Sequence, residues 1–473
     1  MQWLKFRRTR SGENLRTNTQ QDKINIGFVT LVSVVAAIGG LLFGYDTAVI
    51  SGAIGFMQLL FHLSNFMTGW AVSCLTVGAV VGAALAGVLS DRFGRKRMLI
   101  VAGILFSVGS IGSALAGDIT TFVIARIIGG VGIGVSSTLV PLYIAEIAPA
   151  KLRGRLVSLN QLAVVIGISA IYFVNRAVAN AGGQAWDVTT GWRWMFGLGI
   201  VPGIIFIVLL FTVPESPRWL QKQGQGERAL SVLERINGRA QGKIEYEEIQ
   251  RSTENETGSI WTLFRPGYRI ALLVGIVLGI LQQVTGINAI MYYAPEIFKH
   301  TGAGTNAQLT QTIIVGAVNL VFTLVSLWLI DKLGRKALLL IGTAVMTISL
   351  FVVGYEFHSG HSSSALILTF ILIFVAAFAI SMGPVVWLVM AEIFPTRIRG
   401  RATAIASVAL WAADYLVSQT FPVLLSGAGP AKTFGAFGVM SIIAFLFTLF
   451  VVPETKGRSL EEIEQSWGRR SSR

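Results

Sequence analysis

Long apolar runs alternate with short polar segments along the whole chain. Each run is long enough to cross a membrane, which takes about 20 predominantly apolar residues. The twelve runs lie near residues 26–50, 67–89, 98–116, 120–143, 156–178, 195–213, 269–298, 311–330, 337–357, 365–390, 403–425 and 433–452. A transmembrane barrel would instead alternate apolar and polar residues with a period of two. The pattern therefore predicts an all-α membrane protein with twelve transmembrane helices.

Composition and charge support a chain embedded in a lipid bilayer. Of its 473 residues, 53% are hydrophobic and 13% are charged, whereas a soluble domain has about 25% charged residues. The net charge is +14, but 33 of the 38 Lys and Arg residues lie in the segments that share a side with the N-terminus. This is the positive-inside asymmetry. We expect both termini in the cytoplasm, a plasma-membrane location, and no nucleic-acid partner.

Three polar motifs occur twice, in the same order, at nearly constant offset. The pairs are AEIAPAKLRGR with AEIFPTRIRGR (145–155 and 391–401), DRFGRK with DKLGRK (91–96 and 331–336), and VPESPR with VPETKG (213–218 and 452–457). They predict two pseudo-symmetric six-helix halves, 26–213 and 269–452, with an intracellular helical linker at 214–268 and cytoplasmic tails at 1–25 and 453–473. Two such halves with a site between them are typical of secondary transporters that work by alternating access.

Short amphipathic helices are predicted outside the spans. In GERALSVLERING (226–238), the apolar residues Ala229, Leu233 and Ile236 recur at helical spacing. IEYEEIQ (244–250) and SLEEIEQSW (459–467) indicate two more short helices. We expect them to pack on the inner surface and to couple the two halves mechanically.

Further motifs stand at fixed places beside the repeated ones. They are PESPRWL (214–220), QQVTGIN (282–288), YYAP (292–295) and GPVVW (383–387). Together with DRFGRK, the Glu–x6–Arg-Gly-Arg loops and VPETKG, they resemble the sugar porter family of the major facilitator superfamily over about residues 30–467. Within the family, the chain is similar to bacterial xylose, arabinose and hexose proton symporters. The resemblance implies the major facilitator fold and proton-coupled import of a neutral pentose or hexose.

Other functions fit the sequence less well. A facilitative sugar uniporter of the same fold is the nearest alternative, and a membrane sugar sensor is a remote one. We see no metal-ligand cluster, no nucleophile–base pair and no phosphate-binding loop, so we expect neither an enzyme nor a cofactor or metal. The single cysteine, Cys74, allows no intrachain disulfide. We expect the chain to function as a monomer.

Amide side chains dominate the polar residues inside the spans. An amide both donates and accepts hydrogen bonds and so matches a neutral array of hydroxyl groups, although amides also tie transmembrane helices together. The resemblance implies that sugar contacts come from Gln161, Gln282, Gln283, Asn288, Asn319 and Trp387. Trp411 accompanies this set, and Phe43, Tyr292 and Tyr293 would line or gate the cavity. Gly286 predicts a local break in the helix beside these amides.

One cation lies inside a span, Arg126, in TFVIARIIGGVGIGV (121–135). A charge at mid-membrane is costly and needs a partner or water. Asp46, in the otherwise apolar first span, is the obvious partner. We expect Asp46 and Arg126 to couple transport to a proton, because protonation of the carboxylate would weaken the attraction. A static structural ion pair is the alternative.

Acidic residues recur at matching positions of the two halves near the expected inner surface. The resemblance implies ion-pair networks that hold this side closed, with Asp91, Glu146, Arg153, Glu215 and Arg218 in the first half and Asp331, Glu392 and Arg399 in the second. Simple positive-inside anchoring would explain the arginines but not the repeated acids.

Three positions depart from the pattern of the xylose-type relatives. Ile168 and Leu410 stand where that branch has amide side chains, and Asp414 stands where an asparagine is common. The first two remove hydrogen-bonding capacity. Asp414 adds a carboxylate inside a span, which could be neutral, exposed to water or a second titrating group.

Overall fold

A computed structural model describes residues 24–149, 152–254, 268–359, 363–394 and 399–456. Within these residues, all regular secondary structure is helical, and twelve helical stretches are long and apolar enough to cross a membrane. The prediction of an all-α protein with twelve spans is confirmed. The predicted helix at 459–467 lies outside the described residues.

The first six spans form one group of helices. In chain order they are α1 (Ile26–Phe61), α2 (Asn65–Phe93), α3 (Arg95–Leu115), α4 (Ile119–Ile147), α5 (Arg153–Ala179), and a sixth built from α6 (Gln184–Trp186), the π-helix η1 (Asp187–Gly191), α7 (Trp192–Gly197) and α8 (Ile200–Leu210). Helix α1 extends well past the predicted end of the first run. Residues 51–61 remain mostly apolar, and the helix ends only where His62 adopts a left-handed conformation.

The last six spans form the second group. They are α12 (Tyr268–Val284) with α13 (Ile287–Lys299), α14 (Thr305–Leu333), α15 (Arg335–His358), α16 (Ser364–Ile380) with α17 (Met382–Ile393), α18 (Arg399–Gly427) and α19 (Pro430–Phe450). Two of these spans are therefore broken in the middle. The first break occurs at Gly286, as the sequence predicted, and the second at Ser381.

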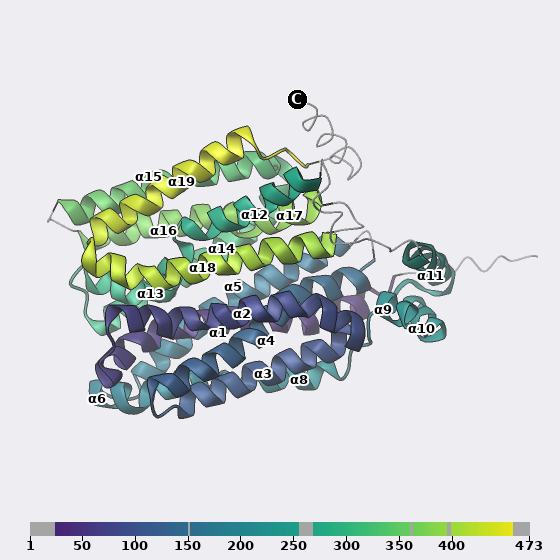
Figure 1. The fold of residues 1–473 in the computed structure, drawn as a ribbon, viewed down its shortest axis with the longest axis horizontal. Helices are drawn as coiled ribbons and strands as arrows, with labels where there is room; N and C mark the ends of the chain where they lie inside the picture. Colours follow the sequence, from purple (N-terminus) through teal and green to yellow (C-terminus); the bar gives the residue numbers. More distant parts are fainter. Residues whose placement is uncertain (1–23, 150–151, 255–267, 360–362, 395–398, 457–473) are drawn as a thin grey trace, which may run out of the picture.

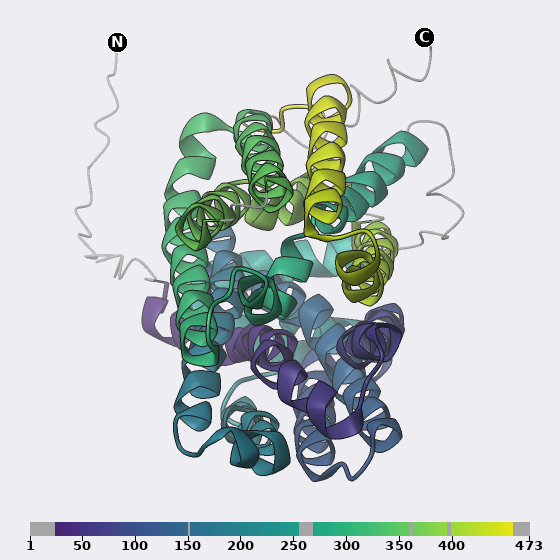
Figure 2. The same ribbon diagram turned by 90° about the vertical axis from the view of Figure 1, so that its left-hand side faces the viewer.

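The two groups lie side by side and pack against each other mainly along three pairs of helices. Figure 1 shows α1–α8 below α12–α19, and Figure 2 shows the same separation from one end. Helix α2 packs on α18, α5 on α14 and α1 on α13. Any space enclosed between these contacts is lined by both groups, which is the arrangement expected of a carrier built from two halves.

Three short helices lie at one end of the bundle, beside the first group (Figure 1). They are α9 (Pro217–Lys222), α10 (Gly226–Asn237) and α11 (Arg239–Glu254). The predicted helix at 226–238 is confirmed, with Ala229, Leu233 and Ile236 buried. The helix predicted at 244–250 is longer than expected, and α9 was not predicted. Its Ser216 cap accepts a hydrogen bond from the backbone of Trp219. We call the end of the bundle at which α9, α10 and α11 lie the linker end.

Tyrosines from neighbouring helices satisfy backbone groups that prolines leave unpaired. A proline inside a helix removes the hydrogen bond to the carbonyl four residues earlier. Pro295 thereby frees the Met291 carbonyl, which accepts a 2.8 Å hydrogen bond from the Tyr172 hydroxyl of α5. Pro422 frees the Ser418 carbonyl, which accepts one of 2.8 Å from Tyr293. The first of these contacts ties the two groups of helices together.

Candidate functional site

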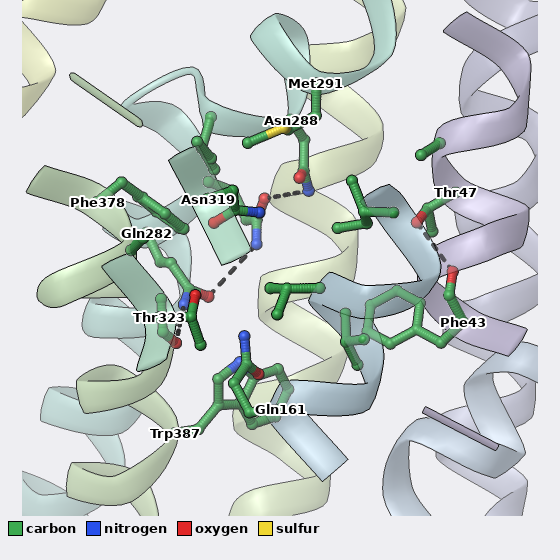
Figure 3. A pocket seen from close by; sticks show the side chains of 18 of the residues that line it. Phe43, Thr47, Gln161, Gln282, Asn288, Met291, Asn319, Thr323, Phe378 and Trp387 are labelled. Atoms are coloured by element: carbon green, nitrogen blue, oxygen red, sulfur yellow. Dashed lines mark hydrogen bonds between the residues drawn. The ribbon is translucent and has the colours of Figure 1, made fainter. Parts of the chain in front are cut away.

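A cavity lies between the two groups of helices. Side chains from both groups line it, and none of the lining residues is charged. Figure 3 shows Gln161 and Asn288 pointing into it from opposite ends. The lining includes nine of the ten residues predicted to form a substrate site: Phe43, Gln161, Gln282, Gln283, Asn288, Tyr292, Asn319, Trp387 and Trp411.

Three of the amides form a hydrogen-bonded chain along one wall of the cavity. The Asn288 amide donates to the Gln283 side-chain oxygen at 2.8 Å, and the Gln283 amide donates to that of Gln282 at 3.4 Å. Gln282 in turn donates to the Met382 carbonyl at 2.7 Å, directly after the break between α16 and α17. This row of hydrogen bonds holds the three amides in defined orientations without a charged group.

The break at Gly286 brings Gln283 and Asn288 together. Gly286 has φ +90°, a conformation that L side chains rarely adopt, and an added Cβ would lie 2.5 Å from the Phe437 ring. A continuous helix would place residues five apart on different faces. The glycine lets α13 restart at a new angle, so that both amides face the same space.

Aromatic side chains close the cavity on other sides. Phe43 of α1 meets Trp411 of α18 edge to face, with 5.3 Å between ring centroids. The buried Trp411 Nε1–H has no hydrogen-bond partner among the described residues, so a donor is available beside the cavity. Tyr292 lines the space, but the predicted Tyr293 does not, because its hydroxyl is directed to the Ser418 carbonyl. Thr47, Thr323 and Phe378 also line it and were not predicted from the sequence.

Asp46 and Arg126 form a buried ion pair inside the first group of helices. The Arg126 guanidinium donates to the Asp46 carboxylate, and also to its backbone carbonyl at 3.1 Å. Their exposed fractions are 6% for Asp46 and 2% for Arg126. Neither lines the cavity, but Thr47, the next residue of α1, does. A change in the ion pair can therefore reach the cavity through a shift of α1.

At the linker end, Arg95 holds the first group of helices together. Its guanidinium donates twice to Glu146, both at 3.1 Å, and forms a 3.0 Å ion pair with Asp91. Its backbone N–H donates to Glu215 at 3.0 Å. The Ser216 hydroxyl also donates to Glu146. These contacts join helices α2, α3 and α4 and the start of the linker at one point. We call this cluster of Asp91, Arg95, Glu146, Glu215 and Ser216 the first clasp.

The second group repeats this clasp. Arg335 donates to Glu392 at 3.2 and 2.9 Å, and its backbone N–H donates to Glu454 at 3.0 Å. The Thr455 hydroxyl donates to Glu392 at 2.5 Å, as Ser216 does to Glu146. Among the described residues, each clasp joins parts of the same group of helices.

The other predicted residues at the linker end lie apart from the clasps or outside the description. The Arg153 guanidinium donates to the Ala148 carbonyl at 3.5 Å, not to Glu146, and its charged neighbours are Arg218 and Glu245. The side chains of Asp331 and Arg399 lie outside the described residues. Arg95, Arg335 and Glu454, which form the centres of the clasps, were not singled out, although the repeated DRFGRK, DKLGRK and VPETKG motifs contain them.

Glu215 and Glu454, which accept backbone hydrogen bonds at equivalent places in the two clasps, differ in how readily they bind a proton. Burial raises the pKa of Glu215 in spite of its backbone N–H donors. Burial also opposes ionisation of Glu454, but backbone N–H groups of Lys456, Arg335 and Lys336 outweigh it and hold its pKa below the usual value. As the pH falls, Glu215 is therefore neutralised first, and the first clasp weakens before the second.

Comparisons with known proteins agree with this geometry. The model of the family described as sugar (and other) transporter matches residues 32–467. The chain belongs to this family, the sugar porters. The arabinose-proton symporter of Bacillus subtilis is 50% identical over 444 residues, covering 94% of this chain and 96% of that one. The D-xylose-proton symporter of Escherichia coli K12 is 42% identical, covering 95% and 97%.

Solved structures of the family match the fold closely. A partially occluded inward-open conformation of the xylose transporter XylE from E. coli has a TM-score of 0.84 at 40% identity, over 92% of this chain and 100% of that one. XylE bound to 6-bromo-6-deoxy-D-glucose has a TM-score of 0.82 at 42% identity, over 93% and 99%. This sugar porter is therefore a multi-pass membrane protein of the major facilitator fold, and a transporter rather than an enzyme.

We expect charge reversal in the first clasp of this sugar porter to open the cavity toward the linker end. In Glu146→Lys, the buried Arg95 would face a second cation, and the attraction that fixes α3 to α4 would become repulsion. The measurement is the labelling rate of Ile168→Cys, a cavity residue, in a Cys74→Ser background. Reagent applied from the linker side should react severalfold faster.

Glu227→Lys is the matched control for this experiment, because it makes the same charge change at an exposed position of α10. It should leave the labelling rate unchanged. Equal rates in Glu146→Lys and the parent would show that the clasp does not govern access to the cavity.

Proposed function

We propose that this sugar porter imports a neutral monosaccharide, a pentose or a hexose, together with a proton across the plasma membrane by alternating access. The uncharged cavity between the two groups of helices, lined by amides and aromatic rings, is the observation that carries this proposal. Amides match sugar hydroxyls, and an aromatic ring can pack on the C–H face of a pyranose. A charged substrate would lack a partner among the lining residues.

The affinity expected of such a site suits a carrier. Each hydrogen bond contributes a net of roughly 0.5–1.5 kcal/mol. A handful of them therefore supports dissociation constants in the millimolar to micromolar range, about −4 to −8 kcal/mol. A sugar held in this range can be released on the other side. We assign the contacts to Gln161, Gln282, Gln283, Asn288, Asn319, Trp387 and Trp411, with Phe43 and Tyr292 around them.

Asp46 and Arg126 are proposed to couple the sugar to the proton. While Asp46 is ionised, Arg126 holds α1 against α4; once Asp46 is protonated, the attraction falls and the helices can move. The names of the relatives, which are proton symporters of arabinose and xylose, support this reading. Because Asp46 and the cavity-lining Thr47 are neighbours on α1, this helix connects the proposed proton site with the sugar site.

The orientation and the inner gate complete the proposal. The linker end and both termini face the cytoplasm, as the distribution of basic residues favours. The halves comprise residues 26–213 and 269–452, and the carrier works as a monomer. The clasps around Arg95 and Arg335, with the further charges at Arg153, Arg218, Asp331 and Arg399, fix the inner ends of the helices in each half. They thereby hold the cytoplasmic side closed until the halves rock.

The test is uptake of labelled D-xylose and L-arabinose into proteoliposomes under an imposed inward proton gradient. Symport predicts accumulation above the external concentration, abolished by a protonophore. Equilibration without accumulation would identify a uniporter instead. Absence of any saturable sugar uptake, across a panel of pentoses and hexoses, would refute the proposal.

A further inference from the structure

A second buried carboxylate lies next to the cavity and is not used by the mechanism above. Asp414, in the middle of α18, has an exposed fraction of 0%. Unlike Asp46, it forms no ion pair with a cation among the described residues. An uncompensated charge inside a membrane protein is costly, and such groups are usually functional.

Hydroxyl groups surround the Asp414 carboxylate. The Tyr292 hydroxyl donates to one oxygen at 3.2 Å and the Ser418 hydroxyl donates to the other at 3.1 Å. The Asn288 side chain also lies close enough to interact with it. Tyr292 and Asn288 both line the cavity, so a single hydroxyl or amide separates the carboxylate from a bound sugar.

The packing around α18 supplies no other charge in the middle of the helix. Helix α13 contributes Tyr292 and Tyr293, and α2 contributes Cys74, which lies near Tyr293. The charged residues on the packed helices α2, α12, α13, α17 and α19 stand near helix ends: Asp91, Arg92, Arg269, Glu296, Lys299, Glu392 and Lys432. Arg126 of α4, the partner of Asp46, is the one further charge that acts on Tyr292 among the described residues. The charge state of Asp414 therefore depends on its own proton and on the polar groups beside the cavity.

We propose that Asp414 is a second proton-binding site, separate from Asp46, and that its protonation tightens sugar binding through Tyr292. This inference rests on the proposed transport of a sugar through the cavity. An ionised Asp414 accepts the Tyr292 hydroxyl hydrogen. A protonated Asp414 donates its own hydrogen to the Tyr292 oxygen, and the Tyr292 O–H is then free to donate to a sugar hydroxyl.

The direction of the effect follows from linkage. A sugar hydroxyl that accepts the Tyr292 hydrogen competes for it with the ionised Asp414 carboxylate, so a bound sugar disfavours the charged form of Asp414. Sugar binding therefore promotes proton binding at Asp414, and by reciprocity proton binding promotes sugar binding by the same factor. Affinity should rise as the pH falls.

The experiment measures sugar affinity without any proton gradient. D-xylose and L-arabinose are titrated calorimetrically into the purified full-length Asp46→Asn carrier between pH 5.5 and 8.5, in buffers of different ionisation enthalpy. Asp46 then contributes no titration of its own. We expect the dissociation constant to be about fivefold or more lower at the acidic end, with net proton uptake on binding.

Two double variants test the residue and the route. Asp46→Asn with Asp414→Asn should bind sugar with no proton uptake and no dependence on pH, and Asp46→Asn with Tyr292→Phe should lose the dependence as well. The matched control is Asp46→Asn with Asp187→Asn, which removes another buried aspartate that does not line the cavity. This control should retain the dependence of sugar affinity on pH.

Three outcomes would overturn the inference. Either pH-independent binding in Asp46→Asn itself, or a dependence that survives Asp414→Asn, would rule out Asp414 as the second site. A dependence that survives Tyr292→Phe would rule out the proposed route. Failure of the parent to bind any sugar would instead refute the proposed function, so the two failures are distinguishable.

Discussion

Asp46→Asn is expected to abolish sugar accumulation while sugar still crosses the membrane down its gradient. The amide retains the shape of the carboxylate, but it cannot exchange a proton or attract Arg126 as an anion. One proton moving inward through 100 mV supplies about 2.3 kcal/mol, which corresponds to about fiftyfold in sugar concentration. The loss should therefore be large in proteoliposomes with an imposed proton gradient, compared directly with the parent.

Two controls separate loss of coupling from loss of the protein. Counterflow exchange of labelled sugar should persist in Asp46→Asn, since Asp46 does not line the cavity. Asp118→Asn makes the same substitution at an exposed residue that caps α4, the helix that carries Arg126, and should accumulate sugar normally. Continued accumulation in Asp46→Asn would place the coupling site elsewhere, and Asp414 would be the next carboxylate to test.

Gln283→Ala is expected to weaken sugar binding by about tenfold to a hundredfold, because buried groups left without a partner cost about 1–3 kcal/mol. Gln283 is the middle link of the amide chain, between Asn288 and Gln282. Its removal takes away one potential sugar contact and leaves the Asn288 amide without its acceptor. Calorimetric titration of the purified variant measures the change. Asn288→Ala should have a similar effect, since it removes the neighbouring amide.

Gln308→Ala provides the comparison for this prediction. Gln308 is a partly buried glutamine of α14 whose amide donates to the Ala303 carbonyl at 2.6 Å, and it does not line the cavity. Its replacement should leave the dissociation constant unchanged. If Gln283→Ala and Asn288→Ala both bind sugar as tightly as the parent, the amide chain serves to join helices and the substrate site lies elsewhere.

The sequence predicted much of the site because the relevant signals are local or rare. A span is recognised from the apolar character of one continuous segment, so twelve spans and the break at Gly286 could be found without knowing any contact. Asp46 and Arg126 could be paired because Arg126 is the one cation within a span, and a buried charge needs a partner. The amides stood out against apolar surroundings for the same reason.

Some roles were decided by directions that the sequence does not encode locally. Two neighbouring tyrosines, Tyr292 and Tyr293, look equivalent in sequence, yet one faces the cavity and the other donates to a carbonyl freed by Pro422. Which way each points depends on the kink that Pro295 allows in α13 and on how α18 packs against it. The repeated glutamates indicated ion-pair networks but not their partners, and only the structure pairs Glu146 with Arg95.

By itself, the sequence determined the membrane architecture, the duplication and the uncharged, amide-rich character of the site, because hydrophobicity, repetition and residue type can be read one segment at a time. Only the tertiary structure decided which residues meet. Arg95 and Arg335 became the centres of the clasps, and Asp414 came to lie one hydroxyl away from the cavity. Such contacts join helices far apart in the chain, and their geometry is set by packing angles and helix breaks that act together.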